Sequence, residues 1–477
     1  MSMSKRRESR QAEMFVQTSA LPDSPGHPFY TKLNELLAAH GFDAFVEEQC
    51  APYYAEKLGR PSIPPGVYFR MLMIGYFEGL SSERGIDWRV ADSLALRQFL
   101  GYALTETTPD HSSLSRIRQR LPLEVHQECF NWVLKVLAEE GLLKGKTVAV
   151  DATTLEANAA LRSIVRRDTG EGYDDYLEGL AQAEGIETPT RQDLAKLDKK
   201  RPKKGSNDDW QHPHDPDARI TKMKDGRTHL AHKAEHTVDL DTQAIVAINL
   251  CGADEGDTES LPWSLIQASM NLEEIILDEA VRKQLEPHKK SFIAEVVTDK
   301  GYHSNHTTKT LKAAGIRSYL SEPDRGRRQW KDDPEAQTAV YGNRRRIRGT
   351  RGQALQRLRA EYTERSFAHT YETGGMRRTH LRGQVNIYKR LCIHCGAFNL
   401  GLVMRKITGM GTPKGLHSLL SVFCALGNLL EFAFDLVGKG HGAFRALIRQ
   451  SALKAGCSHI RQNARCMPYN AGFSTGC

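Results

Sequence analysis

The chain has 477 residues, and its 66 Lys and Arg residues exceed its 58 Asp and Glu residues, giving a formal net charge of +8. At roughly 150 residues per domain this length predicts about three domains, which excludes a small disulfide-stapled scaffold. The mild positive charge permits a polyanionic partner without demonstrating one. Nine scattered cysteines, an odd number, do not suit a disulfide framework, so we expect a reducing cytoplasm.

The two ends of the chain carry no recognisable membrane or export signal. No apolar run follows the basic residues of the N-terminus, so we expect no secretory signal. The longest apolar stretch, residues 416–437, is interrupted by His417, Asn428, Glu431 and Asp435. These polar groups favour a buried or amphipathic helix over a membrane span, and we expect no membrane partner. Residues 1–25 are predicted to be a disordered tail.

Residues 26–143 are predicted to form an all-α N-terminal domain. Apolar residues recur at helical spacing near 33–37, 67–80 and 88–100. A further helix from about Ser112 carries Arg116 and Arg118. Short helices with a basic one among them suit a DNA-binding helix-turn-helix unit. An all-α packing domain with a solvated arginine face explains the same pattern equally well, and both interpretations stay open.

A second domain, residues 144–406, is predicted to be α/β. Short β-prone runs at 147–150, 292–298 and 316–320, and a hairpin over 230–239 and 244–250, alternate with a helical stretch at 261–285 and a short helix before the last run. This order indicates a mixed sheet with flanking helices. Residues 160–228 mix acidic and basic residues and are predicted to be a solvated insertion with little core. Residues 407–477 are left as a C-terminal helical region and tail.

The positive charge concentrates near the end of this second domain. Residues 344–406 contain 15 Lys or Arg residues against three Glu residues, a net charge of +12. The pattern predicts two helices, 353–373 and 385–406, joined by a basic loop over 374–383. Such a segment, interleaved with aromatic residues, suits a nucleic acid backbone. The alternative is a solvated pair of helices with ordinary surface charge.

Several short motifs resemble ligand-binding sites but lack part of the required pattern. Residues 141–147 resemble a phosphate-binding loop, but the spacing is one residue short and a strand follows it. Cys392 and Cys395 have zinc-like spacing within an apolar helical run, without a second pair downstream. Five histidines lack the accompanying ligands of a structural zinc site: His212, His214, His229, His232 and His236.

Two carboxylates carry the chemical hypothesis. Asp151 and Asp299 each stand at the carboxyl end of a short apolar strand. If the strands are neighbours, the two side chains lie close together and suit a hard divalent cation such as Mg²⁺. Two such ions about 4 Å apart clamp the attacking and leaving oxygens of a phosphoryl displacement. A third carboxylate is needed, and helical periodicity does not choose between Glu361 and Glu364.

These residues resemble the DDE transposases of bacterial insertion sequences, in the group that includes the insertion-sequence 4 and 5 types. The matching motifs are Val150–Asn158, Asp225–Gly226 with His229–Asp239, Val297–Tyr302, and Glu364–Phe367 leading into Gly374–Arg378 and Leu381–Gly383. Upstream, Gly59–Pro65, Phe99–Gly101 and Pro109–Arg116 are similar to the helical domain of that group. The resemblance covers about residues 30–405.

The resemblance implies a ribonuclease-H-like core with Asp151 on its first strand, Asp299 on its fourth and Glu364 on a later helix as the catalytic, metal-binding triad. It selects Glu364 because the family's glutamate stands three residues before an aromatic residue, here Phe367. It further implies two Mg²⁺ or Mn²⁺ ions, double-stranded DNA as substrate, and a homo-oligomer in a synaptic complex. The expected activity is cleavage and strand transfer of the chain's own insertion sequence at terminal inverted repeats.

Two alternatives stay open: a related metal-dependent nuclease without strand transfer, and a catalytically silent DNA-binding descendant of a transposase. One departure from the family is visible, because Tyr371 stands seven residues after Glu364 where many relatives have a basic residue. The expected location is cytoplasmic and nucleoid-associated. The predicted DNA-binding residues are Arg116, Arg118, Arg365, Arg377, Arg378, Arg382, Lys389 and Arg390.

Overall fold

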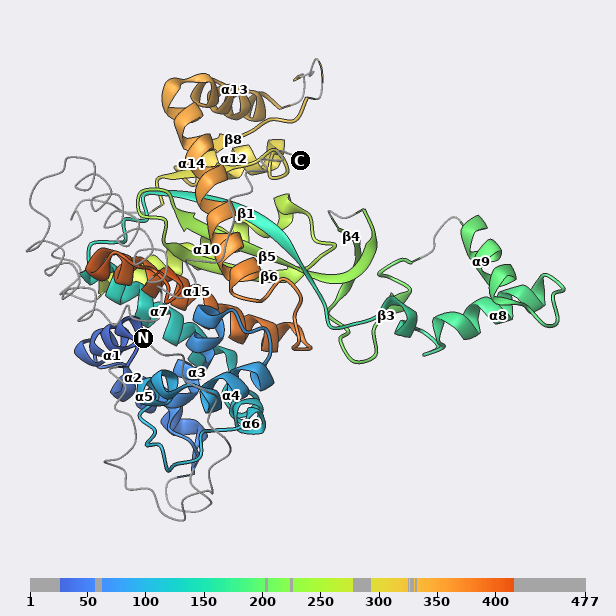
Figure 1. Cartoon of the computed structure of the whole chain (residues 1–477). Coiled ribbons are helices and arrows are strands. Elements are labelled where there is room, and N and C mark those ends of the chain that lie inside the picture. Colours follow the sequence, from blue (N-terminus) through green and yellow to red (C-terminus); the bar gives the residue numbers. More distant parts are fainter. Residues whose placement is uncertain are drawn as a thin grey trace, which may run out of the picture. The chain divides into compact units, whose positions relative to one another are not determined.

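A computed structural model of the chain describes residues 26–55, 62–201, 205–223, 226–277, 293–324, 326, 330 and 333–415. The described residues up to Thr412 belong to one compact unit (Figure 1). The predicted disordered tail at 1–25 and the apolar run at 416–437 lie outside the described residues. Within the described ranges, no helix is both long and apolar enough to cross a bilayer.

The described residues before the first strand form helices. These are α1 (Pro28–Ala39), α2 (Phe42–Cys50), a 3₁₀ turn (Ala51–Tyr53), α3 (Pro65–Glu78), α4 (Glu83–Asp92), α5 (Leu94–Phe99), α6 (His111–Arg120) and α7 (Leu123–Glu139). The run predicted at 88–100 is split between α4 and α5, because the Ser93 hydroxyl accepts a hydrogen bond from the Leu96 amide and starts a new helix.

The sheet is mixed and has the first strand of the chain at its centre. Its order is β4 (Arg219–Lys222), β5 (Thr228–Asp239), β1 (Thr147–Glu156), β7 (Glu295–Thr298) and β8 (Arg317–Leu320), while β6 (Ile245–Gly252) also pairs with β5. Strands β5 and β1 are antiparallel, as are β5 and β6. Strands β1, β7 and β8 run parallel. The predicted mixed α/β architecture is therefore confirmed.

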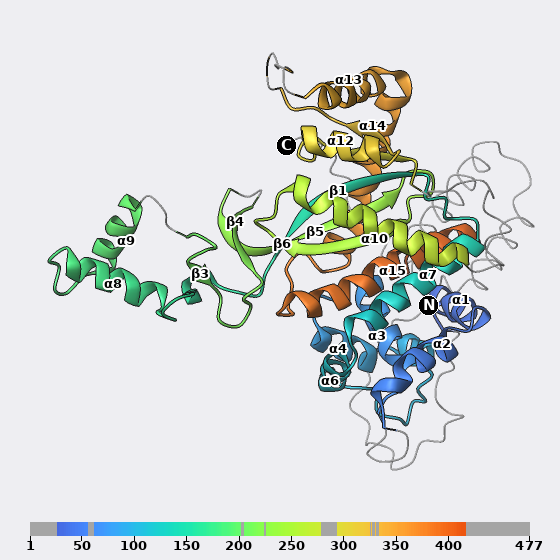
Figure 2. The same ribbon diagram turned by 180° about the vertical axis from the view of Figure 1, so that it is seen from behind.

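Helices cover the sheet on both faces (Figures 1 and 2). One face contacts α10 (Asp257–Leu277), and the other contacts α14 (Thr350–Phe367). Helices α12 (Asn305–Ala313) and α13 (Pro334–Arg348) pack on each other and on β8, and α13 also contacts α14. The sheet is thus buried against helices, as expected for parallel strands joined by crossovers.

Helix α15 (Gln384–Thr408) joins the N-terminal helices to the sheet. It packs on α7, α3 and β6, and it is buried from Leu391 to Leu400 without a break. One hydrophobic core consequently runs from Phe29 through Val150 to Met404. The helical and α/β parts share this core, and the boundary placed after residue 143 stays a prediction.

The charged insertion is more ordered than its composition predicts. It contains a 3₁₀ turn (Leu161–Ser163), β2 (Val165–Arg166), α8 (Tyr173–Ala183), α9 (Arg191–Lys200) and β3 (Trp210–Gln211). Trp210 is buried in a small separate cluster and contacts the rings of Tyr173 and Tyr176. The Arg166 guanidinium also lies over Tyr176 and Trp210. A few aromatic residues therefore give the insertion its own small core.

Candidate active site at the ends of two parallel strands

The parallel pairing of β1 with β7 brings the two predicted aspartates to one edge of the sheet. Ala149 is paired with Val297, and Asp151 and Asp299 each follow two residues later. Side chains two residues apart on a strand point to the same face. Burial is the main cause that raises the pKa of Asp151, and the Asp299 carboxylate raises it further. The predicted juxtaposition of the two carboxylates is present.

Asp151 is held by groups from α14. The Arg359 guanidinium donates to Asp151 Oδ2 over 2.7 Å, and the Thr363 hydroxyl lies 3.1 Å from the same oxygen. The Ala152 amide donates to Oδ1 over 2.9 Å. Burial raises the pKa of Asp151 above its usual value, and the Arg359 charge works in the opposite direction. Asp151 is therefore a largely buried carboxylate with a cation already beside it.

Asp299 lies in a turn closed by its own side chain. Its Oδ1 accepts a hydrogen bond from the Gly301 amide over 2.8 Å. A Cβ at residue 301 would overlap the Asp257 carboxylate and lie 3.1 Å from Asp299 Oδ1. Glycine at this position thus allows a third carboxylate, at the start of α10, to approach the same turn. Neither the strand pattern nor the motifs indicated Asp257.

A buried ionic network supports Asp257 from the centre of the sheet. The Lys233 ammonium on β5 lies 2.7 Å from Asp257 and 3.1 Å from Glu235. Glu235 is fully buried and accepts hydrogen bonds from Ser260, Ser264 and Tyr302. Buried charges of this kind require such partners. The signal for this network in the sequence is the pair of charged residues, Lys233 and Glu235, within a β-prone run.

Glu364 does not form a group with Asp151 and Asp299. It is exposed on α14, one residue after Thr363 and therefore about 100° further around the helix. Among the described residues, no group of three or more His, Cys, Asp or Glu side chains is arranged to hold a metal ion. The structure brings Asp151 and Asp299 together and leaves Glu364 at the surface.

The end of α14 is anchored by a buried polar cluster. The helix continues into a π-helical turn, Ala368–Thr373, in which Tyr371 is fully buried. The Tyr371 hydroxyl lies 2.7 Å from His236 Nε2, and Ser366 Oγ lies 3.0 Å from His236 Nδ1. Burial lowers the pKa of His236 to about 3, so this ring is neutral at pH 7. Tyr371 therefore anchors the end of α14 through a buried hydrogen bond.

Three of the predicted DNA-binding residues are buried. Arg118 donates to Glu83 over 2.8 Å. Lys389 donates to the carbonyl oxygens of Arg118 and Leu121 at 2.9 and 2.7 Å. Arg390 donates to the Leu80 carbonyl over 3.1 Å and to His394 Nε2 over 2.6 Å. Arg118 joins α6 to α4, whereas Lys389 and Arg390 join α15 to the N-terminal helices. All three side chains are buried.

The other predicted DNA-binding residues are at least partly exposed. Arg116 and Arg382 are exposed and donate to the backbone carbonyls of Ser112 and Asn158. Arg365 pairs with Glu361 over 2.6 Å. The remaining two, Arg377 and Arg378, lie in the basic loop that runs beside the end of β1.

The basic loop extends the edge of β1. The Arg377 carbonyl accepts from the Glu156 amide over 3.1 Å, and the Thr379 amide donates to the Glu156 carbonyl over 2.9 Å. The Arg377 guanidinium also donates to Thr153 Oγ1 over 3.0 Å. Arginine side chains therefore lie along β1, and each is paired with a carboxylate: Arg359 with Asp151, Arg377 with Glu372 and Arg378 with Glu156.

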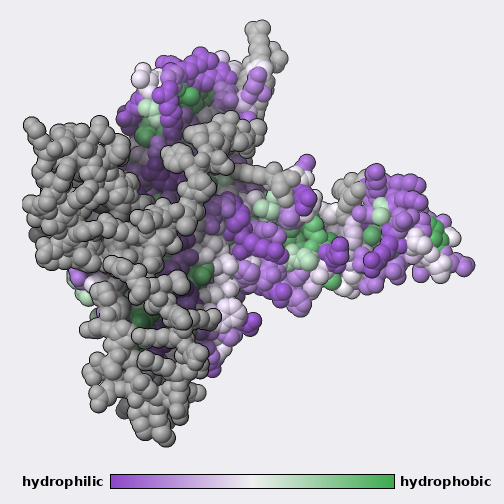
Figure 3. Space-filling model, in the orientation of Figure 1, coloured by the Kyte–Doolittle hydropathy of each residue, from purple (hydrophilic) through white to green (hydrophobic). Residues whose placement is uncertain are grey.

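Much of the +12 charge of residues 344–406 is engaged inside the protein. Among the described residues, seven of its cations form ion pairs with carboxylates of the chain: Arg344, Arg351, Arg359, Arg365, Arg377, Arg378 and Lys406. Others remain exposed, namely Arg345, Arg348, Arg357 and Arg382. Figure 3 shows that the described residues over α13 are mainly hydrophilic. The charge available to a polyanion is consequently smaller than the sequence count.

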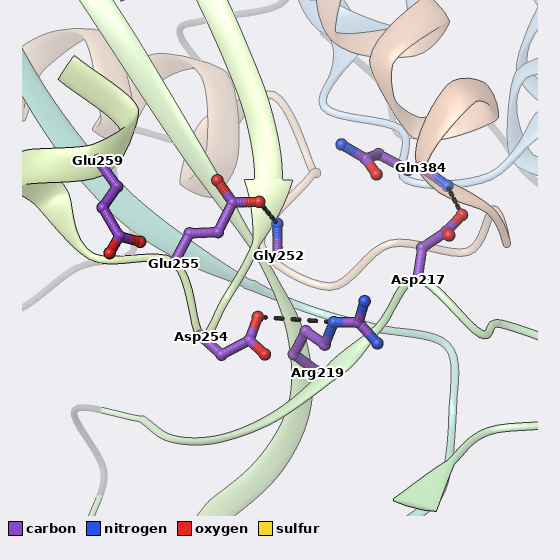
Figure 4. A pocket seen from close by; sticks show the side chains of 7 residues that line it. All are labelled: Asp217, Arg219, Gly252, Asp254, Glu255, Glu259 and Gln384. Atoms are coloured by element: carbon purple, nitrogen blue, oxygen red, sulfur yellow. Dashed lines mark hydrogen bonds and ion pairs between the residues drawn. The ribbon is translucent and has the colours of Figure 1, made fainter. Parts of the chain in front are cut away.

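An acidic pocket of about 370 Å³ lies at the end of β6 and the start of α10 and α15. Figure 4 shows the side chains that line it: Asp217, Arg219, Gly252, Asp254, Glu255, Glu259 and Gln384. Arg219 lies 3.5 Å from Asp254, and the Gly252 amide donates to Glu255. This pocket contains neither Asp151 nor Asp299, so a substitution in it is a suitable control for a substitution of either aspartate.

The two cysteines with zinc-like spacing are buried, and so is His232, one of the five histidines. Cys392 and Cys395 are buried in α15, in agreement with their interpretation as helix-packing residues. His232 is fully buried beside Asp215, with 3.4 Å between His232 Nε2 and Asp215 Oδ2. These four residues belong to the packed interior, whereas His214 is exposed.

Comparison with known families adds a finding on the N-terminal helices. Residues 19–120 match the family described as Transposase domain (DUF772). This part of the chain is similar to a transposase domain. The match supports a transposase function and DNA binding in general, and it covers α1–α6 but not the sheet that carries Asp151. No curated protein and no solved structure gives a significant match to the chain.

Proposed function

We propose that the protein is a DDE transposase that cleaves DNA at the ends of its own element and transfers the freed strand to target DNA. The observation that carries the proposal is the pair Asp151 and Asp299, each two residues beyond the last residues that pair β1 with β7 in parallel, in a chain whose N-terminal part matches a transposase domain. The strand predicted to end at Asp151 continues to Glu156, so Asp151 lies within β1, whereas Asp299 directly follows β7. Double-stranded DNA is the substrate, and a homo-oligomeric complex holds the two ends together.

The order of the strands supports a ribonuclease-H-like core. Apart from the short strands of the insertion, β1 is the first strand of the sheet and β7 is the fourth. These two strands are parallel neighbours; Asp151 lies on β1, and Asp299 directly follows β7. This is the placement that the resemblance to DDE transposases implies for the two aspartates.

The donor chemistry of the site fits Mg²⁺ or Mn²⁺ at two of the three proposed ligands. Asp151 and Asp299 offer carboxylate oxygens at one edge, and a guanidinium cation already lies on Asp151 Oδ2. Glu364 would complete the set after a one-residue change in the register of α14, which would bring it to the position of Thr363. The adjoining π-helical turn is the kind of irregularity that accommodates such a change.

The chain's own residues position the scissile strand. When bound, the metal ions supply Lewis-acid stabilisation of the charge that develops on the phosphate. Asp151 and Asp299 define where the reacting phosphate lies, while Arg377 and Arg378 in the basic loop hold phosphates further along the same strand. Catalysis in such a site is mainly positioning and charge neutralisation.

A strand-transfer assay tests the proposed reaction. The substrate is a plasmid that carries the DNA flanking the coding region, incubated with the protein in Mg²⁺, in Mn²⁺ or in EDTA. We expect metal-dependent cleavage at the flanking repeats followed by joined products. Cleavage without joining would indicate a nuclease, and binding without cleavage would indicate a silent descendant. Either result would overturn the proposal as stated.

A further inference from the structure

A small cavity lies where the N-terminal helices meet the basic loop. Its volume is about 170 Å³, and it lies between the α3–α4 connection, the start of α6 and residues 376–381. The polar side chains that line it and that matter here are Arg84, His111, Arg378 and His380. We call this cavity the notch. Its wall combines residues of the part that matches a transposase domain with residues of the basic loop.

The notch is positively charged. Arg84 is exposed and forms no ion pair with the described residues. Two other lining residues have acidic partners: Arg378, whose side chain is 63% exposed, pairs with Glu156 at 3.6 Å, and His111 lies 3.3 Å from Asp87. His380 is also exposed. Glu83 is the one carboxylate among the described residues that line the notch, and its charge is offset by Arg118. The unbalanced charge therefore favours an anionic ligand.

An exposed aromatic residue extends this surface along α4. Trp88 follows Arg84 by four residues and therefore lies on the same face of the helix, one turn further on. Its side chain is 68% exposed, which is unusual for a large apolar residue. A cation followed by an aromatic side chain on one face suits contact with a phosphate and the adjoining sugar or base.

The distance from the notch to the carboxylate edge can be read along β1. Asp151 and Glu156 are five residues apart on this strand, which corresponds to about 16 Å. Arg378 and Glu156 form an isolated parallel β-bridge beside the notch. Because each base pair of B-DNA advances about 3.4 Å, the same distance corresponds to about five base pairs.

We propose that the notch grips the phosphate backbone of a DNA duplex about five base pairs from the phosphodiester bond at Asp151, with Arg84 as a phosphate contact and Trp88 against the neighbouring nucleotide. The proposal rests on the proposed transposase function and adds a specific DNA contact to it. It moves the DNA contact of the N-terminal helices from α6, where Arg118 is buried, to the surface of α4.

The test is the salt dependence of binding to a fluorescently labelled duplex of mixed sequence. Removing one phosphate contact reduces the slope of log Kd against log salt concentration by about one. We expect this reduction for Arg84→Ala, together with a several-fold rise in Kd. Trp88→Ala is expected to weaken binding with little change in slope, because it removes a contact without a charge.

Arg89→Ala is the matched control. Arg89 is an exposed arginine on the same helix, but it already pairs with Glu78 over 3.1 Å. Its replacement is expected to leave the slope unchanged. Thermal melting of each variant checks that the fold is intact.

The possible failures are distinguishable. If the wild-type chain binds no DNA, both the transposase function and the notch proposal fail. If it binds DNA and Arg84→Ala has the wild-type slope, the notch proposal alone is overturned. Light scattering measures the oligomeric mass of Arg84→Ala. If this mass changes while the salt slope stays at the wild-type value, the notch is a contact between copies of the chain, and the notch proposal is overturned.

Discussion

Helices α14 and α15 come from the same basic segment of the sequence but use their cations in different ways. On α14, Arg359 faces Asp151 and lies at the carboxylate edge of the sheet. On α15, Lys389 and Arg390 are buried and donate to carbonyl oxygens of the N-terminal helices and to His394. A count of charged residues therefore locates a basic segment of the chain. The burial and the hydrogen-bond partners of each side chain decide which of these cations can contact a ligand.

Replacing Asp151 tests the carboxylate edge that α14 covers. Asp151→Asn keeps the size of the side chain but removes the charge that a divalent cation needs. We expect metal-dependent cleavage to fall by at least about 100-fold, with DNA binding retained. Asp254→Asn, in the acidic pocket of Figure 4, is the control and is expected to keep wild-type cleavage. Full activity of Asp151→Asn would remove Asp151 from the site.

Replacing Arg390 tests the structural use of α15. Arg390→Ala leaves the Leu80 carbonyl and His394 without their buried donor, so we expect a loss of about 3 kcal/mol in the free energy of unfolding. Urea denaturation measures this loss. Arg382→Ala, at an exposed site in the same segment, is expected to change stability by less than about 0.5 kcal/mol. Equal stabilities of the two variants would contradict the difference between the regions.

Replacing Arg359 tests whether the α14 cation competes with a metal ion for Asp151. Arg359→Gln removes the charge beside Asp151 Oδ2, so the DNA-free protein is expected to bind Mn²⁺ about tenfold more tightly. Electron paramagnetic resonance of free Mn²⁺ measures the affinity. Arg357→Gln, an exposed neighbour on the same helix, is the control. Unchanged or weaker Mn²⁺ binding by Arg359→Gln would show that the guanidinium does not exclude the ion.

Acidification tests the buried anchor at the end of α14. The pKa of His236 is about 3 in the folded protein and near 6.5 in the unfolded chain, so only the unfolded chain takes up a proton between these values. The stability contributed by the neutral ring is present above pH 6.5 and is lost as the pH falls toward 3.

From pH 7 to 5.5 this contribution falls by about 1 kcal/mol. In urea denaturation at these two pH values, His236→Phe is expected to remove this part of the pH dependence. His214→Phe, at an exposed site, is expected to keep it. An unchanged pH dependence in His236→Phe would contradict the assigned neutral state.

The strands that carry the site could be predicted from the sequence because their signals are local. Short runs of apolar, β-branched residues ending in Asp151 and Asp299 became β1 and β7, and the hairpin became β5 and β6. The long amphipathic runs became α14 and α15. In each case the hydrophobic period matched the element that formed.

The remaining parts of the site depend on contacts between distant residues. Arg359 reaches Asp151 across 208 positions of sequence, and no local pattern distinguishes it from Arg357 two residues earlier. Lys233 and Asp257 likewise meet only through the pairing of β5 with the start of α10. The burial of Lys389 and Arg390 follows from tertiary packing that helical periodicity does not report.

The most direct test of the central claim is to locate the metal site itself. Fe²⁺ substituted for Mg²⁺ reduces added hydrogen peroxide to hydroxyl radicals, with ascorbate regenerating Fe²⁺, and these radicals cut the polypeptide backbone near the bound ion. We predict cuts beside Asp151 and Asp299, and beside Glu364 when DNA is present, all suppressed by excess Mg²⁺. Cuts confined to the acidic pocket around Asp254 and Glu259, or no specific cuts, would contradict the assignment of the active site to the edge of β1 and β7.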